Sequence, residues 1–187
     1  NDNAVFRREF LVTVDPVNDL PTIDELVDLE IDEDADEQMV RLTGISDGDL
    51  GTQPIRVTAS SDNTSLIGDL DLVYQSPNSD GTLAFKPAAN QNGQVVVTVV
   101  VEDGGFDDDL NTSFDNATRT RSYKITVHSI NDPPVAVGDS AELFQEVPMA
   151  IDVLGNDFDV DNEIDVSAVE IKQSPQFGSA TVNANGT

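Results

Sequence analysis

Three aspartates alternate with apolar residues in the segment Asp157-Phe158-Asp159-Val160-Asp161. In a curled loop, side chains at alternate positions can converge on one ion, and calcium takes about six to eight oxygen ligands in irregular geometry. Three like charges side by side without a counter-ion would cost stability, which favours a bound cation over a solvated turn. An EF-hand is disfavoured, because Asn162 and Ala168 stand where that loop needs glycine and glutamate. The spacing therefore predicts calcium binding in another loop geometry.

Other acidic clusters are also candidate calcium-binding loops, and the support for them differs. Ser46-Asp47-Gly48-Asp49 keeps the Asp-x-Asp spacing, and aligning Ser46-Asp47 with Asn156-Asp157 matches the two loops after a one-residue adjustment. Asp103–Asp109 and Glu30–Glu37 are also strongly acidic. Since Asp and Gly are ordinary turn residues, Asp107–Asp109 is equally well interpreted as a solvated turn.

Composition excludes several classes of function. The chain has 36 acidic against 9 basic residues and a net charge of −27, so nucleic-acid binding is not expected. It has no cysteine and no apolar run long enough to cross a membrane, so neither thiolate metal sites nor membrane insertion is expected. His128 is the only histidine, and nothing positions a catalytic carboxylate pair. The chain is therefore not expected to be an enzyme.

An internal repeat organises the sequence. The stretch from Asp2 to Pro21 recurs from Asp115 to Pro134 at a constant offset of 113 residues, from Asn18 to Asn131. The offset predicts that residues 1–17 are the last strand of one repeat, that residues 18–130 are a complete repeat, and that residues 131–187 are the N-terminal half of another.

Strand patterns dominate the complete repeat. Apolar and polar residues alternate over residues 122–127, 55–59, 70–74 and 83–85, and the same alternation at Phe10, Val12 and Val14 predicts a strand in the earlier copy. The nearly unbroken run from Val95 to Val101 predicts a central strand covered on both faces. About seven short strands separated by turns in about 110 residues are typical of an immunoglobulin-like sandwich. The sequence predicts an all-β fold.

In order along the chain come Glu33, the Asp47-Gly48-Asp49 loop, the Glu102–Gly105 turn and an Asn131-Asp132-Pro133-Pro134 linker. In this order the motifs resemble bacterial cadherin-like repeats of large calcium-dependent surface adhesins. The resemblance covers essentially the whole chain and implies tandem Greek-key, immunoglobulin/cadherin-like β-sandwiches with Ca²⁺ at the junctions. Unlike animal cadherins, the chain has no carboxylate at Ala88-Ala89-Asn90.

The resemblance also implies which residues bind calcium. At the earlier junction they are Asn18, Asp19, Asp47, Asp49 and Asp103. At the later junction they are Glu33, Asn131, Asp132, Asp157 and Asp159, and Asp161 continues the spacing of the last loop.

The function implied is a calcium-rigidified repeat region of a large extracellular adhesin or stalk, secreted or attached to the cell surface. Its expected partners are calcium ions, neighbouring repeats of the same chain, and homophilic contacts or cell-surface glycans. The alternative is a calcium-dependent carbohydrate-binding module. That alternative is weaker because the chain has no Trp and only two Tyr for a sugar-stacking platform.

Overall fold

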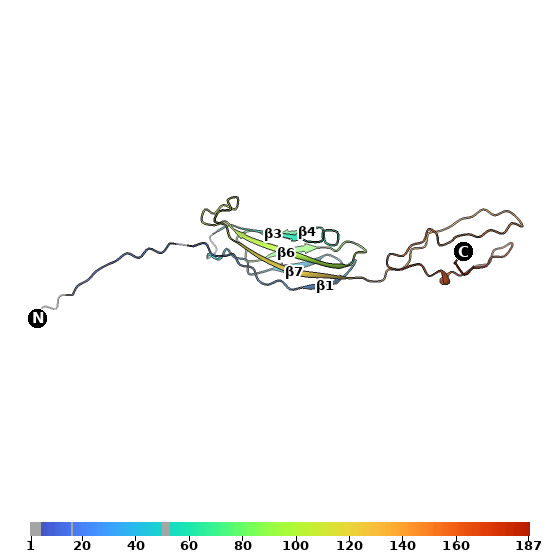
Figure 1. Cartoon of the computed structure of the whole chain (residues 1–187), viewed down its shortest axis with the longest axis horizontal. Helices are drawn as coiled ribbons and strands as arrows, with labels where there is room; N and C mark the ends of the chain where they lie inside the picture. Colours follow the sequence, from blue (N-terminus) through green and yellow to red (C-terminus); the bar gives the residue numbers. More distant parts are fainter. Residues whose placement is uncertain (1–4, 16, 50–52) are drawn as a thin grey trace. The chain divides into compact units, whose positions relative to one another are not determined.

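The computed structural model describes residues 5–15, 17–49 and 53–187 (Figure 1). Two compact units divide the chain, Asn1–His128 and Ser129–Thr187. No described segment forms a helix that is both long enough and apolar enough to cross a membrane.

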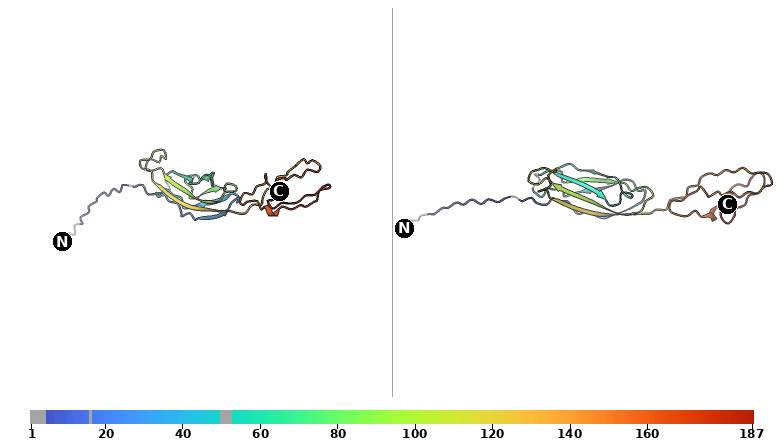
Figure 2. Two further views of the ribbon diagram at one scale, coloured as in Figure 1. Left: turned by 45° about the vertical axis from the view of Figure 1, so that its right-hand side comes forward. Right: turned by 45° about the horizontal axis from the view of Figure 1, so that its top comes forward.

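The first unit is built from two β-sheets. Strands β1, β7, β6 and β3 form one sheet in that order, and β2, β5 and β4 form the other. β1 pairs with β7 in parallel, and the other strand pairs are antiparallel. Figure 2 gives two further views of these strands. Their bounds are β1 Leu29–Asp32, β2 Gln38–Leu42, β3 Ile55–Ser61, β4 Leu70–Val73, β5 Gly81–Phe85, β6 Gly93–Asp103 and β7 Thr118–His128.

The segment that leads into β1 makes a separate backbone contact just after β2. Thr22 forms an isolated antiparallel bridge with Ser46, just after β2, whereas β1 a few residues later pairs with β7 in the other sheet. One segment therefore touches both layers of the sandwich. A segment that touches both layers closes the open edge between two packed sheets and shields it from further strand pairing.

The core lies between the two sheets. Strand β6 contributes Val95, Val97, Val99 and Val101, each at most 1% exposed, and Leu83 of β5 is fully buried opposite them. The prediction that β6 is covered on both faces was wrong, because the residues that alternate with these valines are half-buried or exposed. A two-layer sandwich covers only the inner face of each sheet, so even a central strand keeps one face near solvent.

The buried phenol of Tyr123 makes stability depend on alkaline pH. Tyr123 is 2% exposed, and burial raises its pKa to about 12 from 10.0. Above pH 10 the unfolded chain loses a proton that the folded chain keeps, so the free energy of unfolding should fall by about 2–3 kcal/mol between pH 10 and 12. Urea unfolding followed by circular dichroism at these pH values measures the change. Tyr123→Phe removes the ionisable group, and an equally steep pH dependence in that variant would contradict the assignment.

The predicted strand at Phe10, Val12 and Val14 is not formed. The described residues from 5 to 17 carry no strand, and these three side chains are 86%, 66% and 84% exposed. A strand requires a neighbour for its backbone hydrogen bonds, and no described segment pairs with this one. Asp2, Asn3 and Ala4, which open the repeat match, lie outside the described residues.

The second unit has little regular secondary structure. Its described residues contain an isolated bridge between Val135 and Phe158 and a short 3₁₀ turn, η1, at Val166–Ala168. Leu143, Phe144 and Met149 are at least 58% exposed, so the apolar residues of this unit do not form a closed core.

Candidate metal centre

Five residues predicted to bind metal converge at one end of the first unit. Asn18 Nδ2 donates to Asp103 Oδ1 at 3.1 Å, and the backbone N–H of Asp19 donates to Asp49 Oδ2 at 3.0 Å. Asp47 and Asp103 are both fully buried. The linker, the Asp-x-Asp loop and the end of β6 therefore meet, although they lie up to 85 residues apart in sequence.

The Asp47-Gly48-Asp49 loop is held in a tight turn. Asp47 Oδ1 accepts from the backbone N–H of Asp49 at 3.0 Å, and Asp47 Oδ2 accepts from that of Gln53 at 2.8 Å. Gly48 has φ +89°, and a Cβ there would lie 2.6 Å from the carbonyl oxygen of Leu20. Only glycine permits both this backbone conformation and this approach to the linker.

Gln53 contacts the site although no acidic motif in the sequence pointed to it. Its Nε2 donates to Asn18 Oδ1 at 2.7 Å and to Asp49 Oδ2 at 3.1 Å. Its Oε1 is buried and has no hydrogen-bond partner among the described residues. A neutral amide four residues after an Asp-x-Asp pair is a weak pattern in sequence, which is why it was missed.

The Asp103 carboxylate is the most constrained group of the site. Its Oδ1 accepts from the backbone N–H groups of Gly105 and Ala117, at 3.1 and 2.9 Å, in addition to Asn18. Its Oδ2 is buried without a hydrogen-bond partner, and the carboxylate makes no ion pair with the described residues. A buried carboxylate oxygen left unsatisfied is costly, and a bound cation would satisfy it.

The arrangement would have to adjust to hold an ion. Within the described ranges, no group of three or more His, Cys, Asp or Glu side chains is gathered so as to hold a metal. Instead, the amide N–H groups of Asn18 and Gln53 lie between the carboxylates. Rotating an amide by half a turn exchanges its nitrogen for its oxygen, a choice that the hydrogen-bond network decides. The resulting donor set of carboxylate and amide oxygens fits calcium and not a soft metal.

Asp47 also influences a nearby tyrosine. Burial raises the pKa of Tyr74, the hydrogen bond to Ser76 opposes that rise, and the negative charge of Asp47 adds to it. The negative charge of Asp47 thus acts on the Tyr74 hydroxyl group as well as on the groups of its own loop.

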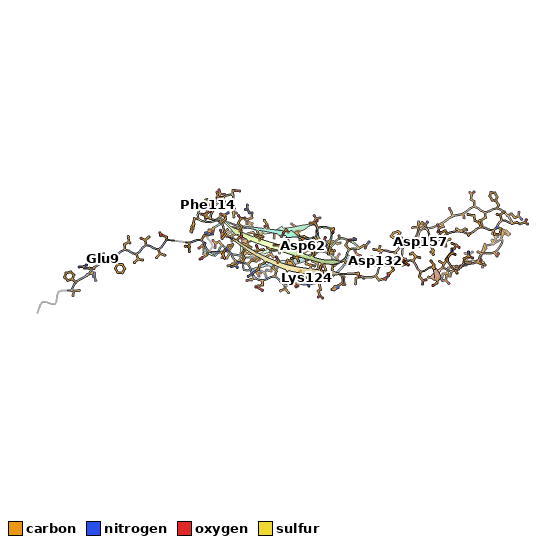
Figure 3. The ribbon with its side chains drawn as sticks, in the orientation of Figure 1. Glu9, Asp62, Phe114, Lys124, Asp132 and Asp157 are labelled. Atoms are coloured by element: carbon orange, nitrogen blue, oxygen red, sulfur yellow. The ribbon has the colours of Figure 1, made fainter. Side chains whose placement is uncertain are left out.

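The second unit repeats the linker-to-loop contacts. Asp132 N–H donates to Asp161 Oδ2 at 2.6 Å, and Asp161 N–H donates to Asp159 Oδ1 at 2.9 Å; Asp132 is labelled in Figure 3. These contacts reproduce those made by Asp19, Asp49 and Asp47 in the first unit. Nearby, Asn162 Nδ2 donates to Asn131 Oδ1 at 2.8 Å.

These contacts correct the alignment of the two loops. Thr22 bridges Ser46, and its counterpart Val135 bridges Phe158, so Ser46 corresponds to Phe158. The pair Asp47 and Asp49 therefore corresponds to Asp159 and Asp161, and the match to Asp157 and Asp159 was wrong by two residues. Asp157, labelled in Figure 3, instead accepts from the backbone N–H of Val137 at 2.7 Å. Sequence similarity misplaced the loop because every second residue there is acidic.

Glu33 lies apart from the other predicted ligands of the first unit. It is 4% exposed, and its N–H donates to the carbonyl of His128 at the end of β7, whereas Asp103 lies beside the start of that strand. The turn after Glu33 gives Asp34 a φ of 59°, and the matching turn of the second unit gives Glu146 a φ of 65°. Glu146 is therefore the counterpart of Asp34, and an uncharged residue, Gln145, stands in the place of Glu33.

A family model described as "Bacterial Ig domain" matches residues 131–187, whereas the sequence motifs had pointed to cadherin-like repeats. No curated protein matches the chain.

Among solved structures, the chain is similar to the titin domains Z1Z2 in complex with telethonin, with 14% identity and a TM-score of 0.35 over 66% of this chain. It spans 55% of the length of that structure's chain. It is also similar to the titin M1 domain, with 12% identity and a TM-score of 0.33 over 59% of this chain and 95% of that one. With its two packed sheets and the bacterial Ig match, the chain is an all-β protein with an immunoglobulin-like β-sandwich fold.

Proposed function

We propose that this chain is a calcium-binding repeat region of a large extracellular adhesin or stalk, in which calcium stiffens the connections between successive repeats. The observation that carries the proposal is the Asp103 carboxylate, fully buried with one oxygen unsatisfied, next to Asn18 and the Asp47–Asp49 loop. The match of residues 131–187 to a bacterial Ig domain supports a surface-type repeat.

The mechanism is a competition between repulsion and ion binding. Without calcium, the carboxylates of Asp49 and Asp103 are held apart by amide groups, and their negative charges repel each other. Asn18, Asp49 and Asp103 would hold the calcium ion, whose positive charge would offset that repulsion, and Asn18 belongs to the linker. The linker then loses the freedom that lets successive repeats flex. In the second unit Asn131, Asp132, Asp159 and Asp161 would act in the same way.

The proposed role is structural and adhesive, not catalytic. Neighbouring repeats are the first partners, and homophilic contacts or cell-surface glycans are the targets that an extracellular adhesin would bind. A sugar-stacking platform is not favoured, since Tyr123 is 2% exposed and Tyr74 is half-buried. A glycan array on which binding is lost on chelation would favour the carbohydrate-binding module instead.

Calcium titration tests the proposal directly. In a calorimetric titration the chain should bind calcium, and free calcium about a hundredfold above Kd should stabilise the first unit by about 3 kcal/mol. Both tyrosines lie in the first unit, so tyrosine fluorescence follows that unit alone during unfolding. Small-angle scattering should show a longer and less variable particle with calcium than with a chelator.

A matched pair of variants separates the site from general charge effects. Asp47→Asn with Asp49→Asn should abolish the stabilisation of the first unit by calcium. Asp69→Asn with Asp71→Asn removes the same charge at the same spacing from exposed positions. This control should leave the stabilisation of the first unit by calcium unchanged. A chain whose melting temperature and scattering are the same in calcium and in chelator would contradict the proposal.

A further inference from the structure

The loop between β6 and β7, residues 104–117, folds back onto the candidate metal centre. Asn18 Nδ2, which donates to Asp103, also donates to the backbone carbonyl of Asp115 at 3.1 Å. Asp115 Oδ2 accepts from the backbone N–H of Phe106 at 2.8 Å, so its side chain turns inward across the loop. One asparagine of the linker thus contacts both ends of this loop.

Several oxygen atoms at the base of this loop are buried without a hydrogen-bond partner. They are Asp103 Oδ2, Asp115 Oδ1 and Asn116 Oδ1, and Gln53 Oε1 lies on the other side of Asn18. Asp103 is 0% exposed, so bulk solvent does not reach its free oxygen. Buried acceptors that no described donor serves, on residues linked through Asn18 and the ends of this loop, favour a cation.

Gly105 lies against both the Asp103 and the Asp115 carboxylates. Its N–H donates to Asp103 Oδ1 at 3.1 Å, and a Cβ on it would lie 2.7 Å from Asp115 Oδ1. Its φ is +60°, which glycine adopts without strain. The absence of a side chain here allows Asp115 to lie against the residue that already binds Asp103, although their like charges oppose this approach.

The other acidic residues of the loop do not share this arrangement. Asp107 accepts from the backbone N–H of Asp109 at 3.0 Å and from the Thr112 hydroxyl at 2.7 Å. Asp109 accepts hydrogen bonds from the backbone and side-chain N–H groups of Asn111, and these bonds lower the pKa of the Asp109 carboxyl group. These two carboxylates are satisfied by the loop itself and need no ion.

We propose that Asp115 is a ligand of the calcium bound through Asp103, so that calcium binding fixes the β6–β7 loop as well as the linker. The proposal rests on the calcium function proposed above and extends it to Asp115, which the sequence analysis did not predict as a ligand. The same loop carries Phe106 and Phe114, 55% and 82% exposed, and Phe114 is labelled in Figure 3. Calcium would therefore also set the position in which these two aromatic side chains are displayed.

A tryptophan placed beside Asp115 can report on the loop. The chain has no Trp, and Phe114 is exposed, so Phe114→Trp supplies a single probe. Calcium should change the fluorescence of this probe and lower its rate of quenching by acrylamide. In the same background Asp115→Asn should weaken calcium binding, measured by calorimetry, by about tenfold or more, because it removes a charged ligand. It should also suppress the fluorescence change.

Asp108→Asn is the matched control in the same loop. Asp108 is exposed at φ 56°, a conformation that asparagine also adopts, and its removal should leave calcium affinity within about twofold. Melting temperatures in chelator check that each variant is folded. If Asp115→Asn binds calcium as tightly as its parent, Asp115 is not a ligand and the inference is overturned. If the parent itself binds no calcium, the proposed function fails as well, so the two failures are distinguishable.

Discussion

Asp103→Ala is expected to lower the free energy of unfolding of the first unit by about 3–4 kcal/mol, because three buried or half-buried donors lose their acceptor. Those donors are the N–H groups of Gly105 and Ala117 and the side-chain amide of Asn18. Urea unfolding followed by tyrosine fluorescence, in the presence of a chelator, measures the loss. Asp69→Ala, at an exposed position, should change the free energy of unfolding by less than about 0.5 kcal/mol.

Asp103→Asn separates the two roles of this side chain. Asparagine keeps an oxygen that can accept the same hydrogen bonds but removes the buried charge, so in chelator this variant should be at least as stable as the parent chain. In calcium the parent chain should be the more stable of the two, because only its carboxylate binds the ion strongly. A variant that is less stable than the parent by the same amount in both conditions would show that Asp103 acts only through its hydrogen bonds.

The second large effect is expected in the core. Leu83 is fully buried at the centre of β5, between Val40 of β2 and Leu72 of β4. Leu83→Ala should destabilise the first unit by about 3–5 kcal/mol, since it removes apolar contacts and leaves a cavity that the two sheets cannot close. Urea unfolding followed by tyrosine fluorescence again provides the measurement.

Val73→Ala is the control for this substitution. Val73 lies at the end of the neighbouring strand in the same sheet but is 61% exposed, so its truncation should cost less than about 1 kcal/mol. A loss of similar size at both positions would mean that β-propensity, and not burial, dominates the stability of this sheet.

Local patterns in the sequence were sufficient to locate most strands of the first unit. Alternation of apolar and polar residues marked β3, β4, β5 and β7, and the valine run marked β6, because the side chains of a strand alternate between two faces. The same patterns did not predict which strand faces would stay exposed to solvent. That depends on whether another layer covers the sheet, and the sequence of one strand carries no information on what lies above it.

The acidic loops were likewise predicted only in part from the sequence. The sequence located the Asp-x-Asp pairs and the linkers, and the structure links Asn18, Asp19, Asp47, Asp49 and Asp103 through hydrogen bonds, some of them by way of Gln53. The sequence did not reveal which residues of the second loop correspond to Asp47 and Asp49. Only the bridge between Val135 and Phe158 decides that alignment.

By itself, the sequence therefore determined that this is an all-β, strongly acidic chain with acidic residues clustered between its strands, and it predicted a repeat of 113 residues. Only the tertiary structure decided that the carboxylate of Asp103 is buried with an oxygen that no described donor satisfies, and that Gln53 and Asp115 contact the asparagine that donates to it. The physical reason is that strand patterns are local, whereas the surroundings of a buried side chain are built by segments far apart in the chain. Asn18 and Asp115 are 97 residues apart and still touch.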